Sequence, residues 1–72
     1  MKASTKRALS ALETQVQTIL DKLETLRDEE QEHLEDLDPE SDKLESTEEV
    51  IATLEDAIAY GEQLLSCFES FV

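Results

Sequence analysis

Two runs of apolar residues, each repeating at the 3–4 spacing of an α-helix face, constrain the fold of this chain more than any other feature. The first run consists of Leu9, Leu12, Val16, Ile19, Leu23 and Leu26. The second run consists of Leu44, Thr47, Ile51, Leu54, Ile58, Gly61, Leu65, Phe68 and Val72. This spacing is typical of helices that pack along an a/d seam. The sequence therefore predicts two long helices.

A turn signal separates the two runs. Residues 38–42 read Asp-Pro-Glu-Ser-Asp, and residues 46–49 read Ser-Thr-Glu-Glu, which is the capping-box pattern of a helix start. We expect an all-α antiparallel helical hairpin that forms one domain over residues 1–72. Its first helix covers about 5–37, the bend about 38–46 and the second helix about 47–71. Residues 39–46 form either a loop or a short extra turn.

The small size of the chain favours self-association. A hairpin of 72 residues buries too little apolar area to offset roughly 1.5 kcal/mol of ordering entropy per residue, and one cysteine allows no internal disulfide. A second heptad pattern, Val50, Ala57, Leu64 and Phe71, widens the apolar face of the second helix. We therefore expect two hairpins to pair into a homodimeric four-helix bundle. The expected dimer and core residues are Leu12, Ile19, Leu26, Ile51, Leu54, Ile58, Leu64, Leu65 and Phe68.

A glycine interrupts the second helical pattern. Gly61 occupies a seam position, where it costs about 1 kcal/mol relative to alanine. Two explanations fit: it permits a close crossing of two helices, or it fills space beside Tyr60 and the two phenylalanines.

Carboxylates are concentrated in residues 28–56. This segment holds fourteen acids and one base, Lys43, so its net charge of −13 equals that of the whole chain. Acids at Glu24, Asp28, Glu32 and Asp36 follow one another at i, i+4 spacing, where each like-charge pair costs about 0.2–0.5 kcal/mol. Nothing in the local sequence offsets this cost, which suggests that the charge serves a function.

The charge density of this segment approaches that of a nucleic acid. Folded as a hairpin, it carries about one net charge per 1.5 Å of length, against about one per 1.7 Å in duplex DNA. A basic, nucleic-acid-binding protein surface is therefore the expected partner, whereas nucleic acid itself and anionic membranes are repelled. The candidate partner-binding residues are Asp28, Glu29, Glu32, Glu35, Asp36, Asp38, Glu40 and Asp42. The alternative is a structural homodimer whose charge serves only solubility.

Little in the sequence points to catalysis or to a cofactor. Glu30 and His33 form a Glu-x-x-His pattern that di-iron bundles use, but the inward carboxylates that such a site also needs are missing, so a metal site is a minor alternative. Cys67 lies at an outward position with no base at helical spacing, which is typical of a surface thiol. We expect a non-enzymatic protein without a cofactor. Because no signal peptide or membrane span is evident, we expect it to be cytoplasmic.

Three short strings resemble a known group of proteins. They read Asp-Glu-Glu-Gln-Glu at 28–32, Pro-Glu-Ser at 39–41 and Glu-Glu-Val-Ile-Ala-Thr-Leu-Glu-Asp-Ala-Ile at 48–58. Over about residues 23–65, the chain resembles short acidic helical-hairpin proteins of bacteria and their phages and prophages. This resemblance implies a protein that acts in a bacterial host cell as an inhibitor of a host-defence or nucleic-acid enzyme. The candidate partners are a nuclease, a CRISPR effector or a DNA-binding regulator. It assigns no role to any single residue.

Overall fold

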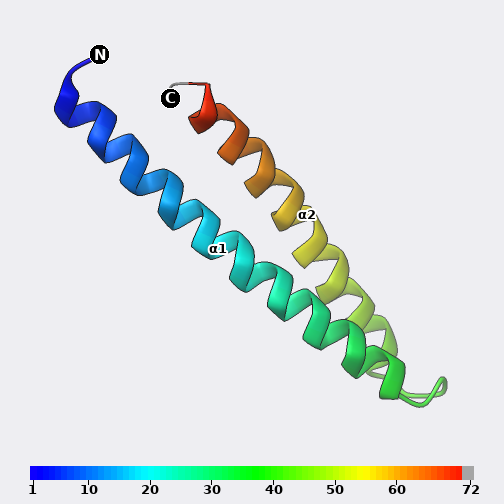
Figure 1. Ribbon diagram of the computed structural model, residues 1–72. Coiled ribbons are helices and arrows are strands. Elements are labelled where there is room, and N and C mark those ends of the chain that lie inside the picture. Colours follow the sequence, from blue (N-terminus) through cyan, green and yellow to red (C-terminus); the bar gives the residue numbers. More distant parts are fainter. Residues whose placement is uncertain (71–72) are drawn as a thin grey trace.

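Two helices account for most of the molecule. The computed structural model describes residues 1–70, in which α1 (Ala3–Asp36) and α2 (Leu44–Glu69) pack as an antiparallel hairpin (Figure 1). Its principal extents are 57 × 14 × 12 Å, so the hairpin is a thin rod. No strand occurs within these residues. The expected end of the second helix at 71 and the last expected seam residue, Val72, lie outside the described residues.

Three of the four expected helix ends lie within the described residues, and each is shifted by one to three residues from its expected position. α1 begins at Ala3, with Lys2 as an N-cap that makes no side-chain capping bond. α2 begins at Leu44 rather than near 47, so the predicted capping box lies inside the helix. There the hydroxyl of Ser46 donates to the carbonyl oxygen of Lys43 at 3.0 Å. The first helix ends at Asp36, one residue before the expected end.

Two consecutive turns form the bend and explain why α2 starts early. A carboxylate oxygen of Asp38 accepts a hydrogen bond from the amide of Glu40 at 2.9 Å, and the amide of Ser41 donates to the carbonyl of Asp38 at 2.8 Å. The hydroxyl oxygen of Ser41 then accepts from the amide of Lys43 at 3.2 Å. These side-chain bonds stabilise the two turns, and α2 begins directly after them at Leu44.

The predicted seam of α2 is confirmed over residues 44–68. Thr47, Ile51 and Ile58 are buried, and the other seam residues are half-buried. The half-buried members are Leu44, Leu54, Gly61, Leu65 and Phe68.

The predicted seam of α1 is wrong for every second member. Leu9, Val16 and Leu23 are half-buried as expected. Their expected companions lie outside the seam and are about half exposed: Leu12 (46%), Ile19 (56%) and Leu26 (48%). The inward positions are instead one residue later in each heptad, at Glu13, Leu20, Arg27 and Leu34.

The packing of Leu20 against Gly61 accounts for this rotation of α1. Leu20 is 6% exposed and is the single buried residue that α1 contributes. A Cβ atom at position 61 would lie 2.5 Å from Leu20 Cδ2, so the glycine leaves the space that this leucine fills. The close-approach interpretation of Gly61 is thereby confirmed. Tyr60, by contrast, is 70% exposed and does not pack beside it in the seam.

Candidate functional site: the acidic end of the hairpin

The hairpin gathers the carboxylates of residues 28–56 at one end of the rod. We call this region the acidic end; it comprises the last part of α1, the bend and the first half of α2 (green and yellow-green in Figure 1). All eight candidate partner-binding residues are exposed there. They are Asp28, Glu29, Glu32, Glu35, Asp36, Asp38, Glu40 and Asp42.

Only one ion pair is found among residues 1–70. The Nε and Nη2 atoms of Arg27 both donate to Asp28 Oδ1, at 3.3 and 3.2 Å. The carboxylate of Asp28 is 72% exposed, so this pair neutralises little of the surrounding charge. The other carboxylates of the acidic end face solvent or, like Glu30, lie half-buried beside the seam.

The charges of α1 oppose its helix dipole at both ends. A helix is stabilised by acids in its first turn and by bases in its last turn. The first turn of α1 has no acid and contains Lys6. The last turn contains Glu35 and Asp36, with His33 as its only base. The charge distribution therefore does not stabilise the helix that carries it.

The exposed acids of α1 form a regular array. Asp28, Glu32 and Asp36 are separated by one helical turn each, which places neighbouring side chains roughly 5–6 Å apart. This spacing lets one row of carboxylates bind several Arg or Lys side chains at once. Arg binds carboxylates and phosphates with the same planar fork, so a phosphate-binding surface can accept such a row.

Glu30 and His33 do not form a metal site within one hairpin. Glu30 is half-buried at the seam, whereas His33 is exposed. In the part of the chain that the structure describes, no group of three metal-ligating side chains comes together. Cys67 is an exposed free thiol, as its outward position indicated.

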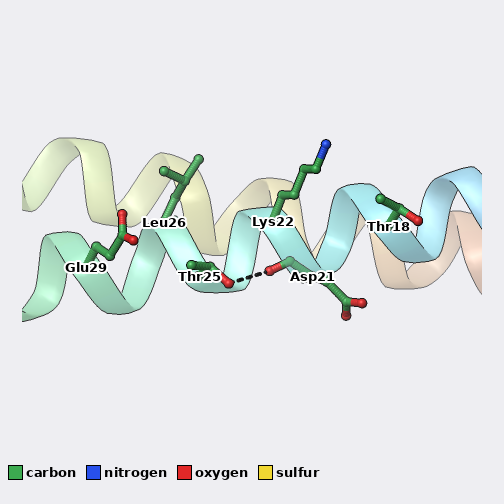
Figure 2. A pocket seen from close by; sticks show the side chains of 6 residues that line it. All are labelled: Thr18, Asp21, Lys22, Thr25, Leu26 and Glu29. Atoms are coloured by element: carbon green, nitrogen blue, oxygen red, sulfur yellow. Dashed lines mark hydrogen bonds between the residues drawn. The ribbon is translucent and has the colours of Figure 1, made fainter.

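One surface groove of the hairpin is formed by α1 alone. It is lined by Thr18, Asp21, Lys22, Thr25, Leu26 and Glu29, all of which project from this helix (Figure 2). The Thr25 hydroxyl donates a hydrogen bond to the carbonyl oxygen of Asp21 at 3.0 Å, within α1 itself. The groove is a shallow furrow between rows of side chains. A similar furrow on α2 is lined by Ser46, Glu49, Val50, Thr53 and Leu54.

Two features of the structure were missed by the sequence analysis. One carboxylate oxygen of Glu13, Oε2, is buried with no hydrogen-bond partner among the described residues. Glu13 takes an inward position because α1 is rotated, so its burial had no signal in the heptad pattern. The second feature is that Leu12, Ile19 and Leu26 form an exposed stripe in the single hairpin.

Comparison with protein-family models, with curated proteins and with solved structures finds no match to this chain. Neither α1 nor α2 contains a stretch that is both long and apolar enough to cross a membrane.

Proposed function

We propose that this protein is a non-enzymatic interaction protein that binds a basic, nucleic-acid-binding protein surface through its acidic end. One observation carries the proposal: residues 28–56 hold the whole net charge of −13, and the fold gathers their carboxylates, mostly exposed, at one end of a 57 Å rod. Such a field attracts a basic partner over long range and speeds its association, most strongly at low salt.

The binding mode that fits this surface is imitation of a nucleic acid. The i, i+4 acids of α1 provide one row of charges and the bend provides more, among them Asp38, Glu40 and Asp42. A nuclease, a CRISPR effector or a DNA-binding regulator has a groove of bases spaced for phosphates. By occupying such a groove, the protein acts as an inhibitor of a host defence or nucleic-acid enzyme, as the resemblance to phage-linked acidic hairpins suggests.

We further propose that the active form is a homodimeric four-helix bundle. Only Leu20, Ile51, Ile58 and Thr47 are buried among the described residues of the single hairpin, and none is below 2% exposure. A core this small does not offset the ordering entropy of two helices. A second chain supplies the missing burial.

The experiment is capture from a bacterial lysate with matched charge reversals. One variant changes Glu32, Glu35 and Asp36 to Lys, which leaves the Arg27–Asp28 ion pair intact. The control variant changes three exposed acids outside the acidic end, Asp21, Glu62 and Glu69, to Lys, and so has the same net charge. Captured proteins are identified by mass spectrometry at low and moderate salt.

We expect the native chain and the control to retain the same nuclease or DNA-binding protein at moderate salt, and the acidic-end variant to lose it. Duplex DNA added to the native complex should displace that partner, because DNA and the acidic end compete for the same groove of the partner. Equal loss in both variants would mean that net charge alone, and not the acidic end, governs binding.

A structural homodimer is the second candidate, and the exposed stripe on α1 favours it. Under this alternative the carboxylates serve solubility, and the lysate yields only a smear of basic proteins that disappears at moderate salt. The acidic-end reversal would then leave every biological readout unchanged.

A further inference from the structure

An apolar face lies beside the α1–α2 seam and is not covered within the hairpin. On α1 it contains Leu12, Ile19 and Leu26, spaced by seven residues. On α2 it contains Val50 and Leu64, which are 47% and 49% exposed, with the half-buried Ala57 between them. We call these six residues the apolar face.

Helical geometry places both stripes on the same side of the hairpin. Viewed along each helix from its N-terminus, both stripes are rotated away from the seam in the same direction. Because the two helices run antiparallel, this shared direction of rotation puts both stripes on the same side of the hairpin. The opposite side has Gln17, Glu24 and Gln31 on α1, and Glu48, Glu55 and Glu62 on α2. One side of the hairpin is therefore apolar and the other polar.

The stripes also interleave along the rod. Gly61 lies beside Leu20, which sets the register of α1 and α2. Both helices rise by the same distance per residue, so the residues of the apolar face can be placed by level from this contact. From the bend toward the termini, residues of α2 and α1 alternate. Their order is Val50, Leu26, Ala57, Ile19, Leu64 and Leu12.

The accessible area of the hairpin leaves room for one further interface of ordinary size. The hairpin exposes 5555 Å². A compact monomer of 8.1 kDa exposes about 4,500 Å². The excess of roughly 1,000 Å² is close to the ~800 Å² that each partner buries in a stable interface.

The charge distribution determines how a second copy is oriented. The same register puts Glu69 level with Leu12, so α1 extends beyond the end of α2 (Figure 1). This extension contains Lys2, Lys6 and Arg7 and no acid. Two copies with their bends at the same end would place two clusters of charge −13 side by side. Copies with their bends at opposite ends place a basic extension beside each acidic end.

We propose that a second copy of this chain covers the apolar face, with the two bends at opposite ends of the bundle. A twofold axis near the level of residue 22 brings the two faces together over their whole length. It places Lys6 of one copy level with Asp38 of the other. The charges that oppose the helix dipole within α1 thus become complementary between copies. Each acidic end remains exposed on its outer side, so the dimer binds two basic partners, a consequence that rests on the proposed function.

The test is distance measurement between spin labels in the full-length dimer. In a Cys67→Ser background, one variant carries Asp42→Cys at the bend and a second carries Asp21→Cys near the proposed axis, on the outer side of α1. Both positions are exposed. Double electron–electron resonance should give about 50–55 Å between the two labels at position 42, because this position is level with residue 39 of α1 and the two labels are therefore about 34 residues apart at 1.5 Å rise. The labels at position 21 should be only about 25–35 Å apart, which corresponds to the width of a four-helix bundle.

Each outcome decides between arrangements. A distance below about 30 Å at position 42 would overturn the orientation and place both bends at one end. No dipolar signal at either position, together with monomer mass in sedimentation, would overturn the dimer. A monomer that still retains its basic partner in the capture experiment would overturn this inference alone. A dimer with about 50–55 Å between the labels at position 42 that captures no partner would overturn the proposed function alone.

Discussion

Gly61 of α2 leaves the space that Leu20 of α1 fills, and a Cβ atom at position 61 would lie 2.5 Å from Leu20 Cδ2. This pair sets both the register and the rotation of α1 against α2. The glycine lowers the helix propensity of α2 by about 1 kcal/mol relative to alanine, and the buried leucine offsets that cost.

A size exchange between these two positions tests the contact. Gly61→Leu should destabilise the protein by about 1–3 kcal/mol because it overpacks the seam, and Leu20→Ala should cost about 2–4 kcal/mol because it opens a cavity. The double variant should recover at least about 1 kcal/mol of the summed loss. Urea unfolding followed by circular dichroism measures all four stabilities. Strict additivity would mean that the two side chains do not share this space.

The Leu20–Gly61 contact also explains which parts of the fold the sequence could predict. The all-α hairpin and the seam of α2 follow from one unambiguous apolar stripe and one turn. On α1 two stripes compete, because Leu12, Ile19 and Leu26 lie on one side of the line of Leu9, Val16 and Leu23, and Leu20 and Leu34 lie on the other. Periodicity alone favours the fuller stripe. The choice is made by the hollow at Gly61, which is a tertiary effect that the spacing of α1 does not contain.

The candidate site was also predictable from the sequence only in part. The exposure of the eight acids followed from their number, since so many carboxylates cannot be buried. The capping box at 46–49 was wrong because α2 begins at Leu44, directly after two turns in which the side chains of Asp38 and Ser41 accept hydrogen bonds from backbone amides. Such local bonds depend on the path of the bend, which a pattern of capping residues does not specify.

Glu13 should be a site of stabilisation. Its Oε2 atom is buried in the hairpin without a hydrogen-bond partner among residues 1–70, and an unsatisfied buried acceptor costs about 1–3 kcal/mol. Glu13→Leu should therefore raise the free energy of unfolding by about 1 kcal/mol or more. Glu62→Leu is the matched control, because it removes an equal charge from an exposed position. Equal melting temperatures in the two variants would show that the gain came only from reduced repulsion.

The apolar face should be sensitive to charge in a way that the polar side is not. Ile19→Glu and Gln17→Glu each add one negative charge at nearly the same level of α1, the first on the apolar face and the second on the opposite side. We expect Ile19→Glu to abolish the dimer in sedimentation velocity and to lower helicity, because a carboxylate buried without a partner costs several kcal/mol. Gln17→Glu should retain the dimer. Loss of the dimer in both would point to overall charge as the cause.

Because the crowded carboxylates of the acidic end repel one another, we expect the protein to become more stable as salt is added. Salt shortens the range of the repulsion among exposed charges, from about 30 Å at 0.01 M to about 8 Å at 0.15 M. We expect the melting temperature to rise between about 10 and 150 mM sodium chloride, which are the two salt concentrations of these screening lengths. Neutralising Glu32, Glu35 and Asp36 to the corresponding amides should raise the melting temperature at low salt and flatten its salt dependence. Changing Asp21, Glu62 and Glu69 to the corresponding amides should have a smaller effect on the melting temperature, since these acids lie outside the acidic end. A melting temperature that falls with salt in the native chain would mean that attraction between the basic extension and the acidic end outweighs repulsion within the acidic end.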